Sequence, residues 1–211
     1  MVCRSLRQRL FANGYDHFMA KYESVMNERK QALLSRVRGK VVELGPGTGV
    51  NLKLLPKGVE WMGIEPNVHM HPILLAKAEA LGISADLRCL SAGNLPLEDA
   101  SVDSVFATLV FCSVDDVDAA LAEIHRVLKP GGCFIFWEHV LAQAGFCLRA
   151  SQHLITPLHL FCGDGCRCNR DFSRALRASP FQNIELEEFR VPPAAAPVWV
   201  RPHVAGVALR S

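Results

Sequence analysis

Apolar and polar positions alternate along the chain in a way that predicts strands separated by helices. Short apolar runs, rich in β-branched and aromatic residues, indicate strands buried on both faces. These runs lie at 41–44, 60–64, 86–90, 102–110 and 133–137. Segments between them carry apolar residues at three- and four-residue steps, which is typical of amphipathic helices. The alternation predicts an α/β fold with a mostly parallel sheet and helices on both faces.

The two ends of the chain depart from this alternation. Residues 4–37 lack proline and show helical spacing, so we expect one or two helices, interrupted near Asn13-Gly14. Residues 141–180 are expected to be mostly helical. The segments 181–191 and 198–209 are strand-like, and we expect them to complete a seven-stranded sheet with one antiparallel strand.

A glycine-rich turn, Glu43-Leu44-Gly45-Pro46-Gly47-Thr48-Gly49, follows the first strand. Glycines can take positive φ and let backbone N–H groups approach a ligand. The spacing differs from the Gly-x-Gly-x-x-Gly of nicotinamide and flavin folds, and a carboxylate beside it suits a cationic ligand better than a pyrophosphate. S-adenosylmethionine, which carries an ammonium and a sulfonium, meets this demand. The alternative is a tight turn without a ligand. A helix is expected to begin at Val50 and to stop before Pro56.

An acidic residue ends the second predicted strand. Glu65 follows Glu43 by 22 positions (65 − 43). In dinucleotide-binding folds an acid at about this distance binds the ribose hydroxyls, because a carboxylate can accept from both. A surface carboxylate is the alternative. The loops at 45–49, 65–67, 91–94, 111–116 and 138–140 all follow predicted strands. In parallel sheets ligands bind at that edge.

Length and charge narrow the class of protein. The chain has 211 residues, enough for one domain, and its net charge of +2 gives no electrostatic reason to expect nucleic acid. Its eight cysteines lie mostly in apolar runs without a signal peptide, which indicates a reducing compartment. Arg and Leu positions in residues 1–11 suit at most peripheral membrane contact. We expect a cytoplasmic monomer with a small-molecule partner.

Several segments together resemble class I S-adenosylmethionine-dependent methyltransferases, over about residues 12–210. They are Glu43-x-Gly-x-Gly-x-Gly, Glu65, Asn94-Leu95-Pro96 and Arg126-Val127-Leu128-Lys129-Pro130-Gly131-Gly132. A narrower resemblance, to the methyltransferase-like seven group, rests on four more segments. These are Thr108-Leu109-Val110 with Cys112-Ser113-Val114, Glu138-His139-Val140, Gly163-Asp164-Gly165-Cys166, and Val200-Arg201-Pro202-His203.

The resemblance implies a Rossmann-like class I methyltransferase fold that binds S-adenosylmethionine. The first carboxylate and the glycine backbone would hold the methionine end, the second carboxylate the ribose, and the loop near position 92 the adenine. The implied cofactor-binding residues are Glu43, Gly45, Gly47, Gly49, Glu65, Ala92 and Gly93. Ser91 stands where many related enzymes have an acid that meets the adenine, so the resemblance implies no carboxylate contact at this position.

The resemblance also implies a division of labour along the chain. We expect residues 1–37 to cover the cofactor cleft, 38–211 to form the methyltransferase domain, and 141–180 to form a helical insert on the acceptor side. Animal members of the narrower group are alkyl thiol S-methyltransferases, so an apolar thiol is the expected acceptor. Those members carry an N-terminal hydrophobic anchor that this sequence lacks, so residence at the endoplasmic reticulum or lipid droplets is not expected to carry over.

Methyl transfer from a sulfonium is an in-line displacement, in which alignment supplies most of the catalysis. A thiol with a pKa near 8.5 is already partly ionised at neutral pH and needs no strong base. His139, after the fifth strand, is the candidate general base, and a structural histidine is the alternative. The group Cys162, Cys166, Cys168 and His159 suggests zinc, but a paired Cys-x-x-Cys is missing, so no metal is predicted.

Three functions fit these residues. The first is methylation of small apolar thiols. The second is O-, N- or C-methylation of a lipid, quinone or other metabolite, because all such enzymes share the cofactor half. The third is a non-catalytic protein that keeps the fold and the cofactor. RNA methylation is not favoured, since neither a basic, aromatic-lined surface nor an Asp/Asn-Pro-Pro-Tyr/Phe/Trp motif is visible.

Overall fold

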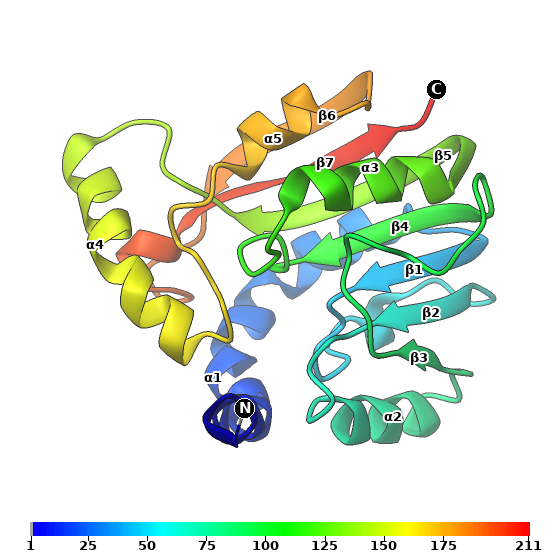
Figure 1. Ribbon diagram of the computed structural model, residues 1–211, viewed down its shortest axis with the longest axis horizontal. Coiled ribbons are helices and arrows are strands. Elements are labelled where there is room, and N and C mark those ends of the chain that lie inside the picture. The colour runs from blue at the N-terminus through cyan, green and yellow to red at the C-terminus, as the bar shows by residue number, and fades with distance from the viewer. Residues whose placement is uncertain (1) are drawn as a thin grey trace.

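A seven-stranded sheet forms the centre of the computed structural model, which describes residues 2–211, with side chains from residue 6 onward (Figure 1). Met1 and the side chains of residues 2–5, part of the predicted N-terminal segment, lie outside the described residues. The strands are β1 (Lys40–Leu44), β2 (Glu60–Ile64), β3 (Asp86–Arg88), β4 (Val102–Thr108), β5 (Leu128–His139), β6 (Asn183–Arg190) and β7 (Pro202–Leu209).

The strand order is β3-β2-β1-β4-β5-β7-β6. The pairs among β1 to β5 are parallel, and β7 runs antiparallel to both β5 and β6. The expected Rossmann-like sheet with one antiparallel strand is therefore confirmed. The order reverses between β1 and β4, so the carboxyl ends of these two strands frame the crevice where ligands bind in such sheets.

The central strands are apolar because both of their faces are covered. In β1, Val42 belongs to the apolar cluster that contains Ile124 and Phe172, on the face of helices α3 (Val117–Val127) and α5 (Phe172–Ala178). Its neighbour Val41 belongs to the opposite cluster, with Leu34 and Leu74 of helices α1 (Val2–Leu34) and α2 (His71–Ala80). Successive side chains of a strand point to opposite faces, so one strand stabilises both layers.

Helix α1 runs without a break, so the interruption expected near Asn13-Gly14 is absent. Glycine costs a helix about 1 kcal/mol relative to alanine, which is too little to end one that packs elsewhere. Tyr22 and Met26 bury one face of α1 in a cluster with Trp137 of β5. Tertiary packing therefore outweighs the local helix-breaking signal.

The helix expected to follow the glycine turn does not form. Only a short 3-10 turn, Leu52–Leu54, forms there. Leu55 is extended, with φ −71° and ψ 141°, as expected for a residue that precedes a proline. Pro56 thus shortens this segment further than its apolar spacing predicts, and residues 50–55 supply no α-helix N-terminus to the turn.

The C-terminal part of the chain supplies one long helix, α4 (Phe146–Cys162), a second 3-10 turn (Val198–Val200) and the strands β6 and β7. Helix α4 lies beside the sheet, at its left end in Figure 1. Several of its apolar side chains are exposed, namely Phe146, Leu154, Leu158 and Phe161. Among the helices of residues 2–211, none is both long and apolar enough to cross a membrane.

Candidate active site

The glycine turn after β1 is the first component of the site. Gly45 has φ 58°, and a Cβ there would lie 2.6 Å from Cγ2 of Val110, so the turn packs too closely for a side chain. Gly47 has φ 57°, and the nearest atom to its virtual Cβ is the Tyr15 ring, 3.9 Å away. Gly47 is therefore the glycine that leaves space beside the turn, whereas Gly45 is required by packing.

Glu65, immediately after β2, is 6% exposed and faces this turn. Its Oε2 accepts from the Gly47 backbone N–H at 2.9 Å, and its Oε1 accepts from the Asn67 N–H at 2.8 Å. Burial raises the pKa of Glu65, while these two hydrogen bonds oppose the rise. Each carboxylate oxygen can accept a second hydrogen bond, so the pair retains the capacity to hold two neighbouring hydroxyls.

Glu43, the penultimate residue of β1, lies just before the glycines and is also buried. Its two oxygens accept from Asn51 Nδ2 at 2.7 Å and from Trp61 Nε1 at 3.0 Å. Burial raises the pKa of Glu43 to about 7, against the lowering effect of these bonds. Oδ1 of Asn51 is buried without a hydrogen-bond partner among the described residues. An acidic group and an unpaired acceptor together suit a bound cation with N–H donors.

The predicted adenine loop lies after β3. Ala92 packs against the apolar cluster of the α3 face, and a Cβ at Gly93 would lie 3.8 Å from Ala119 of α3. The sequence analysis assigned no role to Arg126, yet this residue holds the loop. Its guanidinium donates to the carbonyl oxygens of Leu95 and Leu97 at 3.0 and 2.8 Å.

Helix α1 and the loop after α4 both contact the cofactor-side residues. Asp16 of α1 accepts from Thr48 of the glycine turn and forms an ion pair with Lys77 of α2, with an N–O distance of 2.6 Å. Asn67, next to Glu65, donates to Asp164 of the loop after α4 at 2.9 Å. These two segments therefore lie over the residues expected to bind cofactor.

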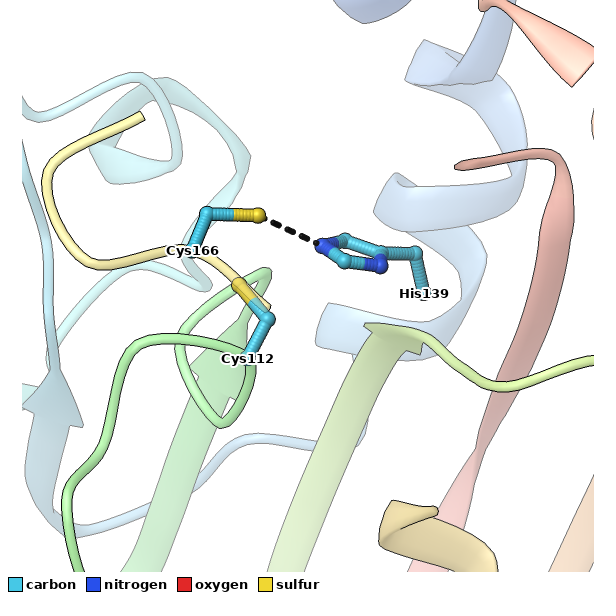
Figure 2. A group of neighbouring side chains, drawn as sticks. All are labelled: Cys112, His139 and Cys166. Atoms are coloured by element: carbon cyan, nitrogen blue, oxygen red, sulfur yellow. Dashed lines mark hydrogen bonds between the residues drawn. The ribbon is translucent and has the colours of Figure 1, made fainter. Parts of the chain in front are cut away.

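His139 ends β5 and belongs to a group that the sequence analysis did not assemble. Its Nε2 lies 3.3 Å from Sγ of Cys166, and Cys112 completes the group (Figure 2). The hydrogen bond with Cys166 and the charge of His139 lower the pKa of Cys112 well below its usual range, despite burial. Burial disfavours the charged imidazole, but the Cys112 thiolate outweighs this and raises the pKa of His139 to about 9.

The cysteine group chosen from sequence is only partly brought together. Cys166, Cys168 and His159 converge, whereas Cys162 is exposed and belongs to neither cluster of ligand-type atoms among the described residues. Cys112 is the member of the group that sequence reasoning missed, because its place in an apolar run is typical of a buried apolar residue. Its separation from Cys166 by 54 positions (166 − 112) hides their contact from any local spacing rule.

A buried chain of hydrogen bonds lies behind His139. Trp137 Nε1 donates to the Tyr22 hydroxyl at 2.6 Å, Tyr22 lies 2.8 Å from Nε2 of His203, and Nδ1 of His203 lies 3.0 Å from the Arg201 carbonyl oxygen. Because the Arg201 carbonyl oxygen only accepts, Nδ1 of a neutral His203 carries the proton and Tyr22 donates to Nε2. Burial lowers the pKa of His203 to about 3, and the nearby charge of His139 adds to this effect.

Gln152 of α4 is fully buried and anchors the segment predicted to form the acceptor-side insert. Its Nε2 donates to the carbonyl oxygens of Val140, Cys168 and Trp199 at 2.9–3.0 Å, and its Oε1 accepts from the Ala142 N–H at 2.9 Å. This single side chain joins α4 to the end of β5, to the cysteine loop and to the turn before β7. Nothing in the sequence distinguished it from a surface glutamine.

Comparisons with known proteins show the family to which the chain belongs. A family model described as a methyltransferase domain matches residues 42–136. The human thiol S-methyltransferase TMT1B is 33% identical over 196 residues, which cover 88% of this chain and 80% of that protein. The human thiol S-methyltransferase TMT1A is 32% identical over 213 residues, covering 93% and 86% of the two chains.

Solved structures show the same fold. A possible histamine N-methyltransferase from Thermotoga maritima, described as S-adenosylmethionine-dependent, superposes with a TM-score of 0.71 at 23% identity, covering 97% of this chain and 99% of that one. A geranyl diphosphate methyltransferase in complex with S-adenosylmethionine gives 0.68 at 16% identity, with coverages of 90% and 86%. Fold and site thus define a class I S-adenosylmethionine-dependent methyltransferase. Within that class, the chain belongs to the family that includes the thiol S-methyltransferases TMT1A and TMT1B.

The residues present fit S-adenosylmethionine as the cofactor. The free lone pairs of the Glu65 carboxylate match a ribose diol, and the unpaired Oδ1 of Asn51 beside Glu43 matches an ammonium group. Within 4 Å, a Cβ at Gly47 would meet only the Tyr15 ring, at ordinary contact distance, so no neighbouring side chain crowds this part of the turn.

Proposed function

We propose that this methyltransferase acts on small apolar thiols. The observation that carries the proposal is a convergence of the four segments on which the narrower resemblance rests. Cys112, His139 and Cys166 form one group, and the rings of His139 and His203 lie 6.3 Å apart across paired positions of β5 and β7. Segments far apart in sequence thus contribute to one place at the carboxyl edge of the sheet, beside the glycine turn.

The charge state of this place suits a sulfur nucleophile. Bound S-adenosylmethionine supplies an electrophilic methyl group on a sulfonium. Because the pKa of His139 is raised to about 9, its imidazole is protonated at neutral pH. A protonated imidazole favours an acceptor thiol in its ionised form. We therefore propose that His139 stabilises a thiolate while the surrounding residues align it, and its role as general base stays a prediction.

We also propose the cofactor contacts as the sequence analysis drew them. Glu43 and the backbone of Gly45, Gly47 and Gly49 would hold the methionine end, Glu65 the ribose, and Ala92-Gly93 the adenine. The contacts of Asp16 with Thr48 and of the Gln8 carbonyl oxygen with Asn67 support a covering role for residues 1–37, and Gln152 supports an acceptor-side role for 141–180. A cytoplasmic location, a monomeric state and the lack of a nucleic-acid partner stay predictions.

The test is a competition among acceptors. Purified protein is incubated with S-adenosylmethionine and a panel of aliphatic thiols, phenols, amines and lipid extract, and products are identified by mass spectrometry. Methylated thiols that disappear with Glu65→Ala support the proposal. Turnover of phenols, amines or lipids with inert thiols would contradict it, because cofactor chemistry would then be intact and the acceptor different.

A lipid or quinone is the second candidate acceptor. Apolar side chains exposed on α4, which flanks the acceptor side, favour it; Phe146 and Leu154 are 86% and 84% exposed. A ubiquinone/menaquinone C-methyltransferase from Rubrivivax gelatinosus is 36% identical, but only over 99 residues, 46% of this chain and 38% of that protein. The lipid arm of the panel separates the two candidates.

A further inference from the structure

Three ligand-type atoms from three separate segments converge at the acceptor edge. They are Sγ of Cys112 after β4, Nε2 of His139 at the end of β5, and Sγ of Cys166 in the loop after α4. All three lie within 4.8 Å of one another, and the Cys166–His139 pair is 3.3 Å apart. Figure 2 shows the Cys166 sulfur directed toward the imidazole and the Cys112 sulfur turned toward the Cys166 side of the group. Ligand atoms around a tetrahedral zinc ion lie roughly 3.5–3.8 Å apart, so small shifts would bring these atoms into range.

The loop that carries Cys166 is held in place by backbone contacts. The Arg167 N–H donates to the carbonyl oxygen of Cys112 at 2.9 Å, and the Cys166 N–H donates to Gly163 at 3.1 Å. Asp164, which lies between Gly163 and Cys166 in sequence, has a positive φ of 49°. Its carboxylate accepts a hydrogen bond from Asn67 and forms an ion pair with Arg7. A preformed arrangement of this kind lowers the entropy that ligands lose on binding an ion.

A second group, His159, Cys166 and Cys168, shares one sulfur with the first. Trp199 Nε1 lies 3.0 Å from Nε2 of His159 and can only donate, so that nitrogen carries the lone pair. The proton of a neutral His159 then resides on Nδ1, which faces Cys166 and cannot coordinate an ion. Nε2 of His139 has no such competing donor, and its Nδ1 is buried without a partner among the described residues. The first group is therefore the better ligand set.

We propose that Cys112, His139 and Cys166 bind a thiophilic divalent cation, with Zn²⁺ as the type case. Binding releases the protons of the ligand atoms to solvent, so His139 coordinates as the neutral imidazole, and the ion takes over the role that its imidazolium has in the metal-free protein. Two sulfur atoms and one imidazole are a donor set that zinc prefers, and two thiolates neutralise its charge in a buried place. The group has three members among the described residues, which leaves one tetrahedral position open. Three protein ligands with an open position are typical of catalytic rather than structural zinc.

The open position can hold the sulfur of the acceptor, and this part of the inference rests on the proposed thiol function. A thiol that enters it exchanges its S–H bond for a metal–sulfur bond and releases one proton to solvent, displacing bound water. The acceptor is then held as a thiolate at the carboxyl edges of β4 and β5, beside the glycine turn. The cation would thus select sulfur over oxygen and nitrogen acceptors, because thiolate is the softest of these ligands.

The test measures metal binding directly on the full-length, reduced protein. Zn²⁺ is titrated against a competing chelator, and Co²⁺ is titrated while the sulfur-to-cobalt absorption bands are recorded. We expect one ion per chain. Cys112→Ser, Cys166→Ser and His139→Gln should each weaken Zn²⁺ binding by more than about 100-fold, since each removes a direct ligand. Cys133→Ser is the matched control, because Cys133 is a buried cysteine of β5 whose sulfur contacts Ser104 instead.

The variants also distinguish the two groups. Loss of binding in His159→Gln and Cys168→Ser, with Cys112→Ser and His139→Gln unaffected, would overturn the assignment. Absence of Zn²⁺ and Co²⁺ binding by the reduced wild-type protein would overturn it as well. Circular dichroism and thermal unfolding of each variant check that a loss is not caused by misfolding.

Addition of butanethiol to the Co²⁺-loaded protein tests the open position. A shift and gain in the sulfur-to-cobalt bands supports thiol coordination, and an unchanged spectrum contradicts it. This readout is independent of methyl transfer. Metal binding without thiol methylation would contradict the proposed function alone, whereas thiol methylation by a protein that binds no metal would contradict this inference alone.

Discussion

The replacement of Glu65 by glutamine tests the proposed ribose contact with a minimal change of shape. The carboxylate now offers two acceptor oxygens, one facing the Gly47 N–H and one facing the Asn67 N–H, each below 3 Å. A glutamine amide has a single acceptor oxygen, so one of these backbone N–H groups and one ribose hydroxyl lose a charged acceptor. Hydrogen bonds to charged groups contribute about 1.5–3 kcal/mol, which corresponds to a roughly 10- to 150-fold loss of affinity.

The assay is isothermal titration calorimetry with S-adenosylhomocysteine, which avoids turnover. Glu60→Gln is the matched control, because Glu60 lies at the exposed, opposite end of β2. The control should bind as the wild type does, and thermal unfolding of both variants should show an intact fold. If Glu65→Gln binds within about twofold of the wild type, then Glu65 does not contact the ribose and only supports the glycine turn.

Three further predictions concern the interior of the site. Burial raises the pKa of Glu43 to about 7, and a bound ammonium favours the carboxylate form. The affinity for S-adenosylhomocysteine, measured by calorimetry, should therefore rise with pH up to about 7 and then level off. Glu43→Gln should show no such rise. Tyr22→Phe leaves a buried indole N–H and a buried imidazole nitrogen unpaired, so chemical denaturation should show a loss of about 2–4 kcal/mol, and Tyr15→Phe should show almost none. Gln152→Leu frees α4 from the end of β5, so steady-state kinetics should show the KM for the thiol rising more than that for S-adenosylmethionine; an equal rise would mean that α4 does not shape the acceptor side.

Local pattern was enough to predict most of the sheet. The apolar runs of β1 and β4 are continuous because helices cover both faces, and such runs are visible in the sequence itself. The acids Glu43 and Glu65 could be located for the same reason, since each lies at the end of a predicted strand beside a turn. Boundaries were less certain where local signals compete with packing, as at Gly14 in α1 and before Pro56.

Only the folded chain reveals the cluster at the ends of β4 and β5. Cys112, His139 and Cys166 meet because β4 and β5 are neighbours in the sheet and because the loop after α4 folds back onto Cys112. Neither relation has a periodic signature, so the sequence could predict a methyltransferase fold and two acids at strand ends but not this cluster. The raised pKa of His139 follows from the same proximity, since a histidine acquires its charge state from neighbours that only the folded chain brings within reach.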